Sequence, residues 1–71
     1  MSQVYIEPLP KGCWGPVDGY SLEFRDGYRI TPQVYRSETL AISEIRLRGY
    51  VPLTARVRVT DKSDPAHWES A

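Results

Sequence analysis

The chain has very few of the side chains from which small proteins build disulfides and metal sites. Its 71 residues include one cysteine and one histidine. Cys13 alone cannot form an internal disulfide, and Cys13 with His67 cannot supply the four Cys/His ligands of a structural zinc site. We therefore expect no metal and no small-molecule cofactor.

Net charge is lacking as well, since nine basic residues balance nine acidic ones. Bulk attraction to DNA or to a membrane is therefore not expected to be the main activity. No apolar run approaches the roughly 20 residues that cross a bilayer, and the opening stretch MSQVYIEPLP has no signal-peptide pattern. Together with the lone thiol, these absences favour a cytoplasmic location and no membrane partner.

A chain of this size also has little core. It buries only about 60% of the surface that its unfolded form exposes, and such a core stabilises a fold by roughly 3–5 kcal/mol. Since neither a disulfide nor a metal can help, stability must come from good packing or from association. A monomer and a homodimer both fit the sequence.

Two segments in the first half have the alternation typical of β-strands. In residues 3–7, Val4 and Ile6 would share one face and Tyr5 would lie on the other. Residues 20–31, YSLEFRDGYRIT, predict a hairpin.

The register of this hairpin can be chosen from its apolar pattern. A two-residue turn would place Phe24 opposite Arg29 and mix apolar with charged side chains on both faces. A three-residue turn at 25–27 places Phe24 opposite Tyr28 and makes one face wholly apolar. The pattern therefore predicts this turn, with Gly27 in the left-handed conformation of a bulge.

The second half predicts one helix and one strand. Ser37 is a suitable N-cap for a helix that ends near Arg48, and Gly49 follows as the residue of the C-terminal cap. Residues 51–60 alternate apolar and polar side chains as a strand does. Residues 61–71 are polar and lack periodicity, and we expect them to form a flexible tail.

These elements predict an α+β fold in a single domain of residues 1–60. The order β-β-β-α-β is most simply satisfied by a small antiparallel sheet, of about three to four strands, with one helix packed on one face.

Between the first two strands lies a loop of residues 8–19 that is long for so small a domain. Within it, the stretch PKGCWGPVDGY contains Trp14 flanked by Gly12 and Gly15. Tryptophan serves both as the lid of a small core and as the anchor of an interface. We expect Trp14 to point into the core, and the alternative is that it faces a partner. Trp68, in the tail, is expected to be free or to dock only on a partner.

The helix has apolar side chains that the core does not need. The arc expected to face the sheet consists of Ala41, Ile42 and Ile45. Leu40 and Leu47 lie on a line away from that arc. Either the 8–19 loop covers these leucines, or they face a protein partner or a second copy of the chain. Arg46 would join them there, because arginine is favoured in interfaces.

A sheet with the helix on one face would carry three arginines on the other, namely Arg29, Arg56 and Arg58. Such a face could contact a nucleic-acid backbone and, with Tyr5, stack on bases. An exposed antiparallel face is also normally polar without binding anything. A small nucleic-acid-binding domain is therefore the alternative function.

Residues for catalysis do not converge in the sequence. Cys13 has no base nearby, since His67 lies far along the chain in the expected tail. No phosphate-binding loop is present. Four acids fall at expected strand ends and turns, where carboxylates are usually solvated or capping: Glu7, Asp18, Glu23 and Asp26. We expect that the protein is not an enzyme.

The segment VYRSETLAISEIRLRGYVPLTARVRVTD combines a small residue at a helix start, a C-terminal glycine and an Arg/Val strand. In size and layout the chain resembles the compact proteins of one sheet and one helix that fill phage and prophage accessory regions. Small anti-CRISPR proteins and other host-takeover inhibitors belong to that class. The resemblance implies a non-enzymatic protein that binds and blocks a larger macromolecule, and no functional residue is carried over from it.

Overall fold

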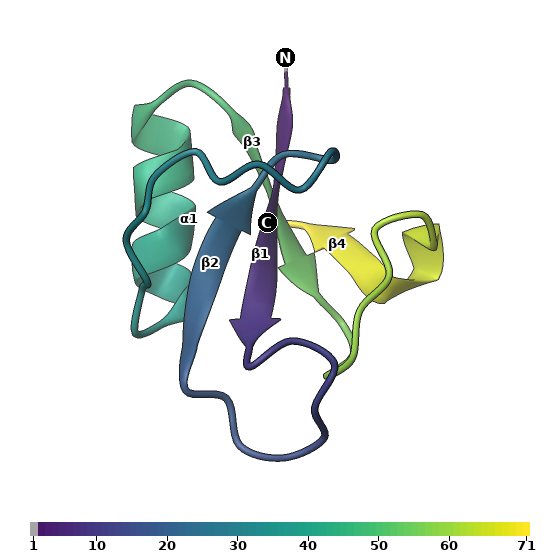
Figure 1. The fold of residues 1–71 in the computed structure, drawn as a ribbon. Coiled ribbons are helices and arrows are strands. Elements are labelled where there is room, and N and C mark those ends of the chain that lie inside the picture. Colours follow the sequence, from purple (N-terminus) through teal and green to yellow (C-terminus); the bar gives the residue numbers. More distant parts are fainter. Residues whose placement is uncertain (1) are drawn as a thin grey trace.

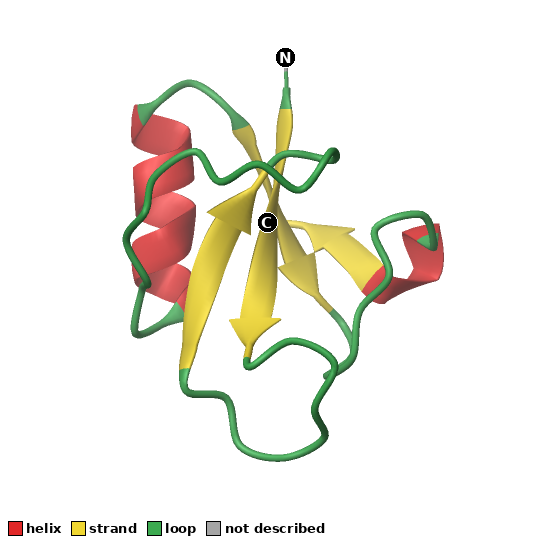
Figure 2. Ribbon diagram, viewed as in Figure 1, coloured by secondary structure: helices red, strands yellow, loops and turns green. Residues whose placement is uncertain are grey.

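The computed structural model describes residues 2–71 and contains one four-stranded sheet and one α-helix (Figure 1). The strands are β1 (Gln3–Leu9), β2 (Gly19–Glu23), β3 (Val51–Ala55) and β4 (Trp68–Ser70), in the order β2-β1-β3-β4. The helix α1 (Glu38–Leu47) packs on one face, and a short 3-10 helix, η1 (Pro65–His67), precedes β4 (Figure 2). The predicted α+β class, with one helix on one sheet face, is confirmed.

The sheet is mixed, whereas the sequence predicted an antiparallel one. The central strand β1 pairs antiparallel with β2 and parallel with β3, and β4 is antiparallel to β3. The segment after the hairpin turn makes only isolated bridges to the outer edge of β2, at Arg29 and Tyr35. Pro32 lies between these bridges and interrupts a strand, because proline has no backbone N–H. The helix then carries the chain back, so that β3 enters beside β1 in the same direction.

The main core lies between the sheet and α1. Its fully buried side chains are Val4, Ile6, Leu22, Ala41 and Ile45. The helix begins where the Ser37 hydroxyl accepts a hydrogen bond from Leu40 N–H. It ends before Gly49, whose φ is +83°. The N–H groups of Gly49 and Tyr50 bond back to carbonyls of the last turn in a Schellman arrangement. The predicted helix and its caps are confirmed.

The hairpin has the register predicted from its apolar pattern. Phe24 N–H donates to Tyr28 C=O over 2.8 Å. Ile30 N–H donates to Leu22 C=O over 2.9 Å. These bonds leave residues 25–27 as the turn, and Gly27 has a φ of +94°, which strains any residue with a side chain. Phe24 and Ile30 pack against the main core, as the register requires.

The strand β3 ends at Ala55, although the alternation in the sequence continues to residue 60. The neighbouring strand β1 explains why β3 ends there. The even-numbered residues of β1 direct their backbone N–H and C=O groups toward β3, as the hydrogen bond from Val51 N–H to Ser2 C=O indicates. The next donor after Ile6 in that series would be Pro8, which has no N–H. The ladder therefore stops, and residues 56–60 leave the sheet.

The structure corrects the expectation that residues 61–71 form a tail. They contain η1 and β4, which pairs with β3 at the edge of the sheet. The Asp64 side chain caps η1 by accepting a hydrogen bond from Ala66 N–H, and Pro65 occupies the first turn. This Asp-Pro pair was a visible helix-start signal. The strand β4 is too short for its alternation to be recognised in the sequence.

Candidate functional site

The sheet face opposite α1 carries an apolar cluster beside an ionic one. The apolar cluster consists of Tyr5, Leu53 and Trp68. The rings of Tyr5 and Trp68 meet edge to face, with their centroids 4.8 Å apart. The Trp68 indole N–H donates to Asp61 C=O over 3.0 Å. Tyr5 thus lies on the face opposite Val4, as its alternation predicted.

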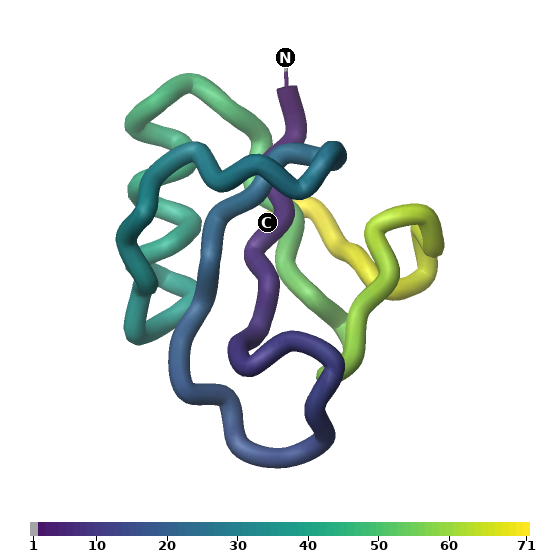
Figure 3. Tube along the Cα trace, in the orientation of Figure 1, coloured from purple at the N-terminus to yellow at the C-terminus, as the bar shows by residue number. Residues whose placement is uncertain are grey.

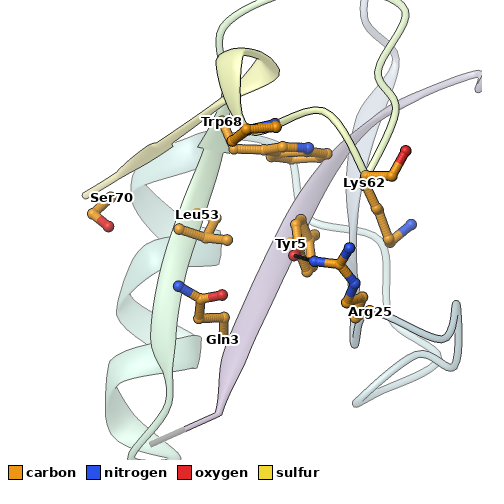
Figure 4. Close-up of a pocket in the computed structure, with 9 residues that line it drawn as sticks. Gln3, Tyr5, Arg25, Leu53, Lys62, Trp68 and Ser70 are labelled. Atoms are coloured by element: carbon orange, nitrogen blue, oxygen red, sulfur yellow. Dashed lines mark hydrogen bonds between the residues drawn. The ribbon is translucent and has the colours of Figure 1, made fainter.

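A cavity of about 430 Å³ lies over this apolar cluster (Figure 4). Tyr5, Leu53 and Trp68 line it from three neighbouring strands, and Arg25 and Lys62 stand beside Tyr5. The Arg25 guanidinium donates to the Tyr5 hydroxyl over 3.4 Å, a long hydrogen bond. Within residues 2–71, no carboxylate, imidazole or thiol lines the cavity. It therefore offers apolar contact area and hydrogen-bond donors.

Two glutamates project from the sheet into the ionic cluster and are almost entirely buried. The exposed fraction is 4% for Glu7 and 1% for Glu23. Burying a carboxylate is costly unless it is paired and hydrogen-bonded. Glu23 accepts hydrogen bonds from the Ser21 hydroxyl and from Lys11, each at 2.6 Å. Glu7 accepts one from the Thr60 hydroxyl.

Lys62 joins the two glutamates. Its Nζ lies 2.5 Å from Glu7 Oε2 and 2.9 Å from Glu23 Oε1. Burial alone would lower the pKa of Lys62, but the hydrogen bonds to Glu7 and Glu23 outweigh it, and the pKa is raised. Burial would likewise raise the pKa of Glu23, but the hydrogen bonds from Lys11, Ser21 and Lys62 lower it. The pKa shifts of Glu23 and Lys62 favour their charged forms, which suits structural ion pairing better than proton transfer.

The expectation that Glu7 and Glu23 are solvated or capping is wrong. A signal was present, because each directly follows a core residue of its strand and must face away from the helix. The sequence did not show what covers them. Lys62 bonds to Glu23 across 39 positions, from the segment expected to be a tail.

Trp14 points away from the core, with 80% of its surface exposed, and the expectation that it closes the core is wrong. Trp68 occupies the space on one sheet face, and α1 covers the other. In Figure 3 the loop of residues 10–18 runs across the bottom of the view, beside the chain that follows β3. From that chain, Arg58 donates to Gly15 C=O over 2.8 Å.

The leucines predicted to lie off the apolar arc of the helix face solvent. Leu40 is 55% exposed and Leu47 is 82% exposed. The 10–18 loop does not cover them, which excludes the intramolecular alternative. Arg46 is exposed on the last turn of the helix. The residues predicted for partner contact are therefore all accessible: Trp14, Leu40, Leu47 and Arg46.

The three arginines of the nucleic-acid alternative do not form the predicted row. Arg58 is engaged by carbonyls of the 10–18 loop. Arg56 and Arg58 line a hollow of about 200 Å³ near the start of β2. Arg29 lies at the outer edge of β2, opposite Glu23. The row is lost because β3 ends at Ala55, before the two arginines that were to alternate on it.

Cys13 and His67 lie in separate segments. Cys13 is exposed in the 10–18 loop. His67 accepts a hydrogen bond at Nδ1 from Asp61 N–H, and its Nε2 lies 3.2 Å from the Asp64 carboxylate. In the described part of the chain, no three His, Cys, Asp or Glu side chains gather closely enough to hold a metal ion. Nor does any helix in residues 2–71 have the length and apolar character to cross a bilayer.

The chain matches no protein-family model, no curated protein and no solved structure.

Proposed function

We propose that the protein is a non-enzymatic interaction module that binds and blocks a surface of a larger protein. The observation that carries the proposal is Trp14, which is 80% exposed in a loop whose backbone is hydrogen-bonded to another segment. Most tryptophans in folded proteins are largely buried. Tryptophan is also enriched among the residues that dominate binding energy, because it adds a large contact area with few torsions to order.

The outer side of the helix supports the proposal. Leu47 is 82% exposed and Leu40 is 55% exposed, and they lie seven residues apart, which is about two turns. Single exposed apolar residues are common, so these two are secondary to Trp14. Arg46 adds a guanidinium on the last turn that can pair with a carboxylate of the partner.

We also propose a cytoplasmic location and a role as a phage- or prophage-encoded inhibitor. The one cysteine, free and exposed, supports a reducing compartment. The resemblance in size and layout to phage accessory proteins supports the inhibitor role. An inhibitor of this kind acts by occupying a surface, so it needs no catalytic group.

The test is capture of a partner from a lysate of cells in which the chain is expressed. Immobilised wild type is compared with Trp14→Ser and with Tyr28→Ser. Tyr28 is the matched control, because it is an aromatic residue with 75% exposure in a different turn. We expect Trp14→Ser to lose the partner and Tyr28→Ser to keep it. Circular dichroism verifies that both variants fold.

Two other results with the same proteins would point to a different partner. If the sedimentation mass of wild type rises with protein concentration and that of Trp14→Ser does not, the partner is a second copy of the chain. Nucleic acid that binds with a steep salt dependence, and is lost in an Arg56→Ala/Arg58→Ala variant, would overturn the proposal in favour of nucleic-acid binding. A protein partner bound equally by Trp14→Ser and wild type would remove Trp14 from the interface.

A further inference from the structure

The loop that carries Trp14 has little of its own structure to hold it. Two residues suffice to join adjacent antiparallel strands, yet residues 10–18 connect β1 to β2. The base is closed by the bond from Asp18 N–H to Leu9 C=O, at 2.8 Å. Gly12 and Gly15 flank Trp14 with φ of +70° and +137°, and a Cβ at either would meet nothing within 4 Å. These glycines allow the turn, but the space on the side-chain position of each is open, so no packing there fixes the loop.

After Trp14, the contact comes from Arg58. Its Nε donates to Gly15 C=O over 2.8 Å, and its Nη2 donates to Pro16 C=O in a longer hydrogen bond of 3.4 Å. One guanidinium therefore spans two successive carbonyls directly after the tryptophan. Its N–H groups are fixed in a plane and orient both carbonyls at once, which the single ammonium of a lysine cannot do.

Before Trp14, the contact comes from Lys11, whose Nζ lies 2.5 Å from Glu23 Oε2. The Glu23 side chain is 1% exposed and also accepts hydrogen bonds from Ser21 and Lys62. An ordinary surface ion pair is weak, because both of its side chains must be ordered. Here one partner is already immobilised by other bonds, so Lys11 is attached to a fixed point on the sheet.

We propose that Arg58 and Glu23 are positioning residues that hold Trp14 in its binding conformation before a partner arrives. This inference rests on the proposed function of Trp14. Preorganisation strengthens binding because the loop does not have to be ordered when the complex forms. If only about a tenth of the molecules kept the competent loop conformation, the apparent Kd would rise about tenfold.

The direct test is ¹⁵N relaxation of the full chain, without any partner. The backbone amide of Trp14 reports on the loop, and that of Trp68 serves as the internal reference. For wild type we expect both order parameters near the rigid value of about 0.85. In Arg58→Met we expect Trp14 to fall below about 0.6, the range of flexible segments, while Trp68 stays rigid. Glu23→Gln keeps the shape of the side chain but removes its charge. It should lower the order parameter of Trp14 by less than Arg58→Met does.

Two further variants separate positioning from general electrostatics. Arg58→Lys keeps the charge but not the two-carbonyl geometry, so it should loosen Trp14 nearly as much as Arg58→Met. Arg56→Met is the matched control, because Arg56 is exposed in the same segment and donates its backbone N–H to His67 C=O, a bond that the substitution leaves in place. It should leave Trp14 as rigid as in wild type.

Different results would contradict the positioning role of Arg58 and the proposed function of Trp14. A Trp14 that is flexible in wild type, or that stays rigid in Arg58→Met, overturns the positioning role whatever the partner is. A partner that binds Trp14→Ser normally overturns the proposed function, and the relaxation result still stands. With a captured partner, Arg58→Met should raise Kd about tenfold while Arg56→Met leaves it unchanged; an unchanged Kd for Arg58→Met would overturn the role of preorganisation in binding.

Discussion

The two tryptophans of this protein have opposite environments. Trp14 sits among glycines and prolines in a long loop and is 80% exposed. Trp68 sits in a polar C-terminal segment and is 8% exposed. Their local sequences suggested the reverse, since glycine-hinged loops can fold a lid over a core and polar ends of chains usually fray.

The difference shows that what lies opposite in the fold determines the burial of an aromatic side chain. Trp68, on β4, faces the ring of Tyr5, on β1, across the intervening strand β3 and gains an edge-to-face contact at 4.8 Å. The loop that carries Trp14 is bound to another segment through its backbone, by Arg58, and the indole is left exposed. The ring of Trp68 therefore has another ring to pack against, whereas in the Trp14 loop only the backbone carbonyls are bound.

The largest expected effect comes from removing the buried member of this pair. Trp68→Ala should lower the free energy of unfolding by about 3–5 kcal/mol, the usual result of truncating a buried aromatic. A core of this size supplies no more than that, so the variant should be largely unfolded at 25 °C. Urea titration followed by far-UV circular dichroism measures the change, and a cooperative transition like that of wild type would contradict it.

The next largest effect concerns the ionic cluster. Through Lys11 and Lys62 it attaches the Trp14 loop and the C-terminal segment to Glu7 and Glu23 of the sheet. Lys62→Met leaves Glu7 and Glu23 buried with fewer partners. Breaking a fully buried pair costs roughly 3–5 kcal/mol, and we expect about 2 kcal/mol here because Lys11 still pairs with Glu23.

Lys11→Met is the comparison for that variant. The Lys11 side chain is 48% exposed, and its loss should cost under about 1 kcal/mol. Chemical denaturation of both variants gives the two values. Equal losses would mean that burial does not distinguish the two lysines.

Acid should also weaken this ionic cluster. The pKa of Glu23 is lowered in the fold from its ordinary value of 4.5. Its contribution to stability is therefore complete above that ordinary value and is lost as the pH falls through the lowered one. The pKa of Lys62 is raised from 10.5, so its contribution is complete below that value and is lost in strong alkali. Melting temperature followed from neutral pH into acid should fall below about pH 4.5 in wild type, and less steeply in Glu23→Gln.

The smallest effect is expected for the exposed tryptophan. Trp14→Ala should change the free energy of unfolding by less than about 0.5 kcal/mol, because the side chain gives up almost no buried area. Thermal unfolding measures this directly beside Trp68→Ala. A loss above about 2 kcal/mol would show that Trp14 packs against the fold and is no free anchor.

Local patterns in the sequence predicted local structure well. Ser37 caps the helix and Gly49 follows its end, since both depend on bonds within a few residues. The hairpin turn at 25–27 followed from which register keeps Phe24 and Leu22 on one side. The alternation of β1 also placed Tyr5 opposite the helix, since side chains alternate along any strand.

The candidate site was predicted only in part, because its contacts cross long sequence distances. Leu40 and Leu47 were recognised as outside the apolar arc of the helix, and they are exposed. The cluster around Lys62 was missed, since a lysine in a polar segment shows no sign of two buried glutamates. The arginine row failed because a strand was assumed to continue where Pro8 of its neighbour cannot donate a hydrogen bond.

The sequence by itself determined where the helix begins and ends, how the hairpin turns, and which side chains of β1 and β2 face the helix. These depend on propensities, caps and periodicity, which act within a few residues. Only the tertiary structure decided that β3 runs parallel to β1, that the C-terminal segment covers the second face, and which tryptophan is buried. Each of these depends on which distant segments pack together on a limited apolar surface, and in so small a domain that surface holds Trp68 and leaves Trp14 outside.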